Sequence, residues 1–115
     1  MDFKATSAIY LQIGDYILEK ILLRELKPSD KIPSVRELAV LLQVNPNTVV
    51  RAFGYLEDNA IIQKQRGIGY FVSDDAYDKA LKIKTEHFLH QELPALFRTL
   101  DLLGLTLNDL KKIKK

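Results

Sequence analysis

The stretch KIPSVRELAVLLQVNPNTVVRAF, residues 31–53, carries the start signals of two consecutive short helices. Ser34, followed three residues later by Glu37, forms a capping box: the serine hydroxyl accepts from the Glu37 amide, and the carboxylate accepts from the amide of the cap residue. Asn45 is a favourable N-cap, and Pro46 stands at the first helical position, where its missing N–H leaves no bond unmade. The apolar spacing behind the caps predicts helices that end near residues 43 and 59. Two short helices joined by a turn of about three residues are typical of a helix-turn-helix.

A longer amphipathic helix is predicted before this motif. Tyr10, Ile13 and Ile17 recur at three- and four-residue steps, within a periodic segment from about residue 7 to residue 26. The turn residues 27–30 then end the helix. The side chains expected in the core of this half of the chain are Tyr10, Ile13, Phe53, Leu56 and Phe71.

A β-hairpin is predicted after the motif, because the hydrophobic period changes there. Residues 61–65 and 70–73 read as two short strands around a basic turn at residues 66–69. Gly67 and Gly69 suit such a turn, since glycine adopts positive φ without steric penalty. A hairpin that follows a helix-turn-helix makes a winged helix.

A helical pattern resumes at Asp75 and continues to the C-terminus. Pro94 lies inside it and is expected to kink or divide the helix, because proline lacks an amide and clashes with the preceding turn. Residues 102–105 read as a break, and Thr106 with Asp109 caps a last helix. The predicted fold is therefore mostly α with a small β-hairpin wing: a winged helix-turn-helix domain over residues 1–74 and a short helical region over 75–115.

Composition limits the classes of protein to which the chain can belong. It has 115 residues, 47% of them hydrophobic, a formal net charge of +2 and no cysteine, which excludes disulfide scaffolds, thiol nucleophiles and Cys-ligated zinc. Its apolar runs fall far short of the ~20 residues that a membrane span needs, and no apolar leader follows Asp2 and Lys4. We expect a cytoplasmic protein without a membrane-bound part.

Three motifs together resemble the winged-helix domain of GntR-family transcriptional regulators: residues 31–39 (KIPSVRELA), 44–52 (VNPNTVVRA) and 66–72 (RGIGYFV). The opening residues 9–13 (IYLQI) and the short tail look like the YtrA-like subfamily, whose members carry a small dimerisation region in place of a large effector-binding domain. The resemblance implies binding of double-stranded DNA, with contacts from Arg36, from residues 45–48 and from Gly67.

The residues themselves support the same surface. Short polar groups at the start of the second helix of the motif can meet bases and phosphates, and exposed arginines and lysines can pair with phosphates or guanine edges. Many family members have Arg at the positions of Pro46 and Val50, so the sequence preference of better-known members does not transfer. The candidate DNA-binding residues are Ser34, Arg36, Asn45, Pro46, Asn47, Thr48, Arg51, Lys64, Arg66 and Gly67.

The C-terminal region contains more large apolar side chains than two short helices can bury between themselves. We therefore expect a homodimer, which would present two recognition helices to a palindromic operator with half-sites ~34–36 Å apart or a multiple of that distance. A repressor is the expected role. The candidate interface residues are Phe88, Leu89, Leu93, Leu96, Phe97, Leu107 and Leu110.

Two functions other than DNA binding are compatible with the same sequence. A winged helix that contacts only proteins is the main alternative, and a small-molecule effector bound between subunits stays open. No nucleophile–base pair or phosphate-cradling glycine loop is visible, so an enzyme is not expected. His87 and His90 share a helical face, but the spacing fixes no third ligand, so neither a metal site nor a cofactor is predicted.

Overall fold

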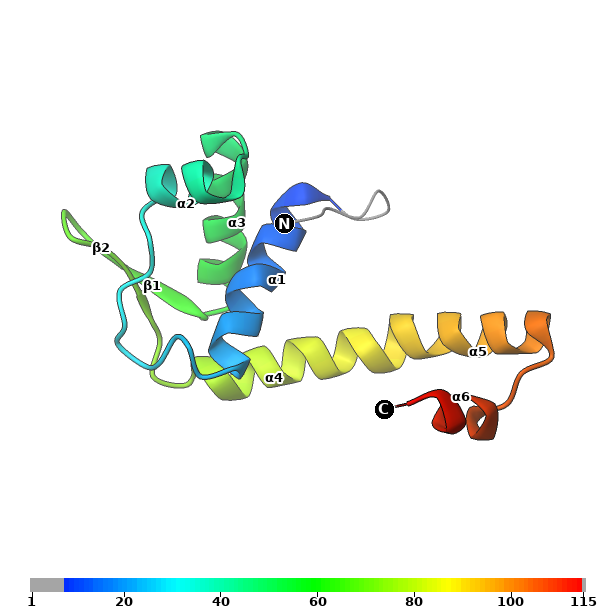
Figure 1. Ribbon diagram of the computed structural model, residues 1–115. Helices are drawn as coiled ribbons and strands as arrows, with labels where there is room; N and C mark the ends of the chain where they lie inside the picture. Colours follow the sequence, from blue (N-terminus) through cyan, green and yellow to red (C-terminus); the bar gives the residue numbers. More distant parts are fainter. Residues whose placement is uncertain (1–7, 115) are drawn as a thin grey trace. The chain divides into compact units, whose positions relative to one another are not determined.

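The computed structural model describes residues 8–114 and is mostly helical, with one antiparallel two-stranded hairpin (Figure 1). This architecture confirms the predicted fold class. Within the described residues, no helix has the length and apolar character needed to cross a membrane. The elements are α1 (Ile9–Leu22), α2 (Val35–Leu42), α3 (Pro46–Asp58), β1 (Ile62–Gln65), β2 (Gly69–Val72), α4 (Ala76–His87), the π-helical turn η1 (Phe88–Glu92), α5 (Leu93–Leu103) and α6 (Leu107–Ile113).

The chain forms two compact units, the first ending at Leu81 and the second beginning at Lys82. The first half of α4 belongs to the first unit, because Ala76 and Ala80 are fully buried there. The compact units thus divide later than residue 74. The predicted boundary between a DNA-binding part (residues 1–74) and a dimerisation part (residues 75–115) concerns function, and it stays a prediction.

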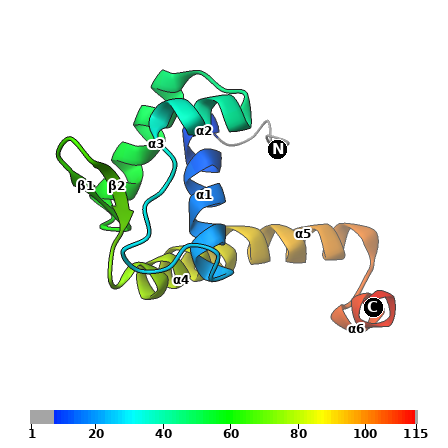
Figure 2. The ribbon, with the colours of Figure 1, turned by 60° about the vertical axis from the view of Figure 1, so that its left-hand side comes forward.

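The core of the first unit lies between α1, α2, α3 and the hairpin. Figure 2 shows α1 running beside α3, and these two helices pack against each other. Burial of each large aliphatic or aromatic side chain contributes about 1.5–3 kcal/mol, so this core holds the three helices together. The largest fully buried side chains are Ile13, Ile17, Leu18, Ile21, Ile32, Leu38, Val49, Phe53, Leu56, Ile61 and Ile62.

Helix α1 is shorter than the periodicity predicted. It ends at Leu22 because Arg24 adopts the left-handed conformation (φ 64°), and the Glu25 amide then donates to the Lys20 carbonyl (2.9 Å). This pattern is the common left-handed termination of a helix. The Arg24 guanidinium lies over the ring of Tyr77, 3.7 Å from its centroid, which ties the end of α1 to α4.

A segment before α2 extends the hairpin by main-chain bonds that the sequence pattern did not reveal. The Ser29 amide donates to the Val72 carbonyl (2.9 Å), and the Val72 amide donates to Asp30 (2.9 Å). The Ile32 amide donates to the Tyr70 carbonyl (3.0 Å). Residues 29–32 therefore brace β2 on the side opposite β1.

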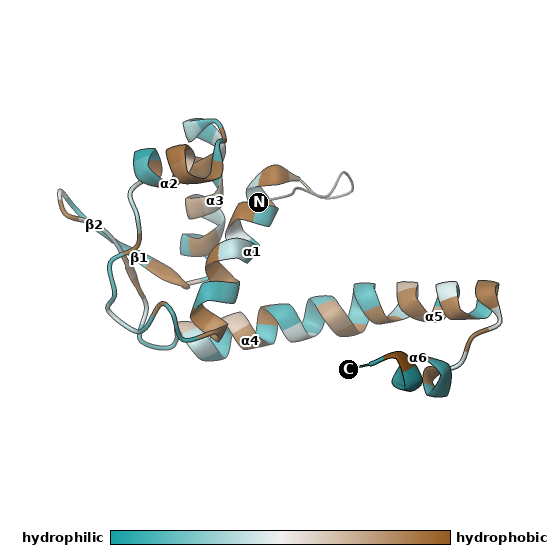
Figure 3. Ribbon diagram, in the orientation of Figure 1, coloured by the Kyte–Doolittle hydropathy of each residue, from teal (hydrophilic) through white to brown (hydrophobic). Residues whose placement is uncertain are grey.

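The helix that the sequence predicted to be interrupted by Pro94 is interrupted by a π-helical turn. The Leu93 amide donates to the Phe88 carbonyl, five residues back, and Pro94 then stands at the start of α5, where its missing amide is tolerated. Gly104 ends α5 with a left-handed φ of 68°, and Thr106 caps α6 as expected. In both ribbon views α6 lies beside α5, and hydrophobic residues recur along both helices (Figure 3).

Candidate nucleic-acid interface

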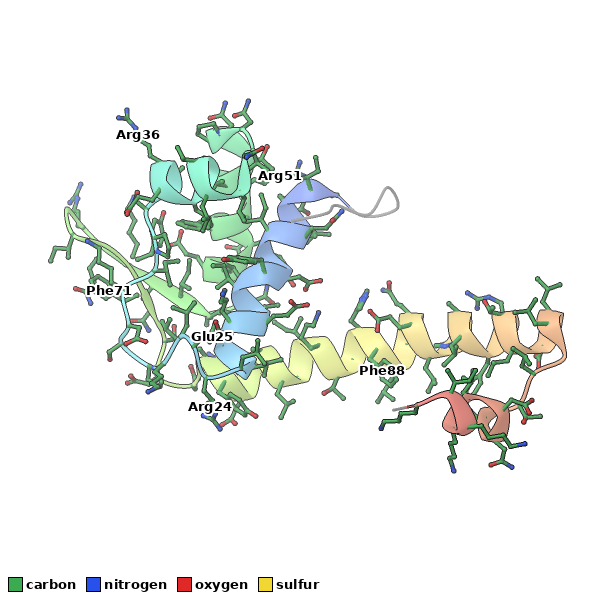
Figure 4. The ribbon with its side chains drawn as sticks, viewed as in Figure 1. Arg24, Glu25, Arg36, Arg51, Phe71 and Phe88 are labelled. Carbon is green, nitrogen blue, oxygen red and sulfur yellow. The ribbon has the colours of Figure 1, made fainter. Side chains whose placement is uncertain are left out.

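The start of α2 is fixed by the predicted capping box, and this orients Arg36. Ser34 Oγ accepts from the Glu37 amide, and Glu37 Oε1 accepts from the Ser34 amide, each at 3.1 Å. The bond from the Ser34 amide, and then that from the Ser34 side chain, lower the pKa of the Glu37 carboxyl, because they stabilise the charged carboxylate. Arg36 lies in the first turn, exposed, and extends outward from α2 (Figure 4).

The start of α3 presents polar groups in the way the sequence predicted. Asn45 Oδ1 accepts from the Asn47 amide (2.8 Å), and Pro46 occupies the first turn. Asn47 is exposed and Thr48 half-buried, while Val49 is fully buried on the opposite side of the helix. The N-terminal turn of α3 is therefore an exposed, polar helix end, of the kind that favours contact with anions.

Arg51 extends this polar side by one turn. Its guanidinium lies over the ring of Tyr10, with Cζ 4.1 Å from the ring centroid, and Figure 4 shows it where α3 meets the N-terminal turn of α1. A shallow pocket of about 390 Å³ is lined by Ala8, Ile9, Tyr10, Asn47, Thr48 and Arg51. The expectation that Tyr10 belongs to the core is wrong, because this ring is only half-buried.

The wing carries Lys64 in β1 and Arg66 at the first position of its turn, and both are exposed. Gly67 has a positive φ of 76° with open space around it, and Gly69 has a φ of 138°. A Cβ added at Gly69 would lie 2.9 Å from Cε of Lys31, so the Lys31 side chain crosses the base of the turn. Phe71 is half-buried in β2, so its assignment to the core is wrong as well.

The structure brings the candidate DNA-binding residues together in three groups. Asn47, Thr48 and Arg51 share one pocket, and Asn45 and Pro46 precede them at the helix end. Ser34 and Arg36 lie at the start of α2. The third group is the wing turn, with Lys64, Arg66 and Gly67.

Sequence reasoning missed two residues beside these groups. Tyr10 stands at the edge of the apolar stripe of α1, one turn before Ile13. An aromatic residue with a polar tip at such an edge is a signal of surface contact, and this signal was overlooked when Tyr10 was assigned to the core. Lys31 follows the turn before α2, and only the pairing of residues 29–32 with β2 reveals its place beside the wing.

The C-terminal candidates form a largely exposed apolar set. Leu93 and Leu110 are half-buried. Leu100, which was not among the candidates, is the one buried residue in the described range 82–114 (5% exposed). His87 Nε2 lies 3.5 Å from Glu92 Oε1, and no group of three or more metal-binding side chains occurs among residues 8–114. The exposed candidates are Phe88, Leu89, Leu96, Phe97 and Leu107.

Comparison with known proteins agrees with this arrangement. The family described as bacterial regulatory proteins, gntR family, matches residues 9–72. The HTH-type transcriptional repressor YtrA of Bacillus subtilis is 43% identical over 76 residues, which cover 66% of this chain and 58% of YtrA. This chain therefore spans less than two thirds of that relative's length.

Solved structures show the same fold. A protein from Bacteroides thetaiotaomicron, described as a GntR-family transcriptional regulator, superimposes with a TM-score of 0.69 at 42% identity and covers 92% of each chain. The DNA-binding domain of AraR, solved in complex with operator ORR3, matches at 26% identity with a TM-score of 0.58, over 64% of this chain and 88% of that one. With a winged helix-turn-helix, an exposed polar start of α3 and the family match over residues 9–72, this chain belongs to the GntR family of bacterial transcriptional regulators.

Proposed function

We propose that this protein is a homodimeric repressor that binds a palindromic operator in double-stranded DNA. One observation carries the proposal: α2, α3 and the wing bury their apolar sides in one core and leave Arg36, Asn47, Arg51, Lys64 and Arg66 exposed. YtrA is named a repressor, and AraR was solved on an operator, which supports the same role here. A regulator of this kind works on the chromosome, in the cytoplasm.

The exposed residues fall into two groups, those suited to contact base edges and those suited to contact phosphates. Asn47 and Arg51 lie on α3, the proposed recognition helix, where amide and guanidinium groups can read base edges in the major groove. Arg36, Lys64 and Arg66 suit phosphates, which position a protein on the duplex without reading its sequence. Gly67 allows the wing backbone to approach the duplex closely.

Val50 is expected to give this chain a base preference that differs from that of family members with arginine at this position. It replaces the arginine of many family members and is 54% exposed on α3. A valine cannot pair with guanine, but its methyl groups can pack against the C5-methyl of thymine. The operator preference therefore has to be measured for this chain.

Dimerisation is the second half of the proposal. Phe88 and Phe97 are 46% and 43% exposed in the single chain, and large exposed apolar patches mark interaction sites. A second copy of the same surface would cover them and give the two-fold symmetry that a palindromic operator requires.

The test is selection of bound duplexes from random DNA by the full chain, followed by affinity measurements over a range of salt concentrations. We expect inverted half-sites, and Arg36→Ala is expected to weaken binding and reduce the slope of log K against log salt by about one per subunit. Lys111→Ala, which removes one exposed charge from α6, is the matched control and should leave the slope unchanged. Failure to select any duplex would contradict the proposal.

A further inference from the structure

The contact between Arg51 and Tyr10 leaves the arginine able to bind DNA. The five N–H donors of a guanidinium lie in its plane, so stacking of its face on a ring leaves its edges free. Arg51 is exposed, and among residues 8–114 no carboxylate forms an ion pair with it. The stacked contact therefore fixes the position of a charge that no described carboxylate neutralises.

The Tyr10 ring is itself held in place by α1 and α3. It meets the Tyr55 ring edge to face, with centroids 6.4 Å apart and planes at 75°. Tyr55 in turn packs closely on Gly14, where an added Cβ would lie 3.0 Å from Tyr55 Cδ2. Burial raises the pKa of the Tyr55 hydroxyl, as expected for a ring enclosed between two helices.

The N-terminal turn of α1 therefore lies next to the polar side of the recognition helix. The pocket that Tyr10 and Arg51 line also includes Asn47 and Thr48, two of the candidate DNA-binding residues. A side chain that stacks on Tyr10 is thus held beside the groups proposed to meet the bases.

We propose that Tyr10 is a positioning residue for DNA binding, whose ring holds the Arg51 guanidinium beside Asn47 and Thr48 before DNA arrives. The inference rests on the proposed function, in which Arg51 contacts double-stranded DNA. An unrestrained arginine loses rotamer freedom when it binds, so an arginine already held on a ring loses less and binds more tightly.

The test compares Tyr10→Phe with Tyr10→Leu in the full chain, using one duplex that the wild type recovers from random DNA. Phenylalanine keeps the π-face, so Tyr10→Phe should bind like the wild type. Leucine keeps apolar volume but removes the face, so Tyr10→Leu should bind about two- to fivefold more weakly per subunit. Tyr16→Leu is the matched control on the same helix: its ring lies under Lys20 Nζ (5.3 Å) instead of under a candidate DNA-binding residue, so affinity should not change.

A double-mutant cycle separates positioning from a structural effect. If Tyr10 acts through Arg51, then Tyr10→Leu should have no further effect on affinity in the Arg51→Ala background. Equal losses in both backgrounds would overturn the inference, as would wild-type affinity of Tyr10→Leu with only a lower unfolding temperature. Wild-type affinity of Arg51→Ala would overturn it too, while DNA binding by the chain would stand. Absence of DNA binding by the wild type would instead be the failure of the proposed function.

Discussion

The ring of Tyr70 in β2 meets the ring of Phe53 in α3 edge to face, with centroids 4.8 Å apart and planes at 70°. Phe53 is almost fully buried (1% exposed), so this contact anchors the wing to the core side of the recognition helix. The two elements proposed to touch DNA are thereby joined by one aromatic pair.

We expect Tyr70→Leu to lower the free energy of unfolding by about 1 kcal/mol beyond the loss of buried area, because edge-to-face pairs contribute about 0.5–1.5 kcal/mol. Denaturant unfolding of Tyr70→Leu, Phe53→Leu and the double variant measures the coupling between the rings. If the two losses simply add, the contact has no specific role in holding the wing.

The two wing glycines should respond differently to substitution. Gly69 has a φ of 138°, which side-chain-bearing residues rarely adopt, and a Cβ there would meet Lys31 Cε at 2.9 Å. Gly69→Ala is therefore expected to cost about 1–3 kcal/mol of unfolding free energy. Gly67 has a φ of 76° with no atom near an added Cβ, so Gly67→Asn should keep nearly all of its stability, since asparagine tolerates this conformation. Denaturant unfolding measures the unfolding free energy of both variants. Equal losses would contradict the prediction that only Gly69 is restricted to glycine.

The capping box of α2 should make stability depend on pH. Hydrogen bonds from Ser34 hold the pKa of Glu37 below its ordinary value of 4.5 in the folded chain. A carboxyl with a lowered folded pKa stabilises the fold above its unfolded pKa, and this contribution is lost as the pH falls through the folded value.

Unfolding free energies between about pH 6 and about pH 3 test this for the wild type and Glu37→Gln. Glutamine can still accept from the Ser34 amide but does not titrate. The variant should therefore lose less stability on acidification than the wild type. Parallel pH profiles for the two proteins would mean that Glu37 contributes nothing to acid sensitivity.

The sequence was sufficient where a local signal decides the structure. Ser34, Asn45 and Thr106 each mark a helix start through their own side chain, and the structure places a helix after each. These are bonds between residues two or three apart, which a sequence pattern records directly. The helix-turn-helix was predictable for this reason.

The remaining features depend on contacts between distant residues. The pairing of residues 29–32 with β2 joins segments about forty residues apart along the chain, and no local pattern encodes it. Tyr10 fits an amphipathic stripe equally well as a core residue or as a platform, and only the packing of α1 on α3 places it under Arg51. Before Pro94 the helix continues through a π-helical turn, in which the hydrogen bonds span five residues instead of four. The composition of the segment does not specify this hydrogen-bond pattern.

Leu96 and Phe97 are exposed on α5, within the proposed dimer interface. Phe97→Asp should convert a dimer to a monomer in sedimentation experiments at micromolar concentration, because a second copy would have to bury an unpaired carboxylate. Leu102→Asp is the matched control: Leu102 is 84% exposed on the same helix, one turn after Arg98 and outside the proposed interface, so this variant should stay dimeric.

The same pair of variants links assembly to DNA binding. The Phe97→Asp monomer should lose most of its affinity for a duplex with two half-sites while it keeps the wild-type affinity per half-site, since α2, α3 and the wing are unchanged. Two outcomes would show that this apolar side of α5 does not join two recognition helices. One is a wild-type chain that is already monomeric, and the other is a Phe97→Asp variant that binds the full duplex as tightly as the wild type.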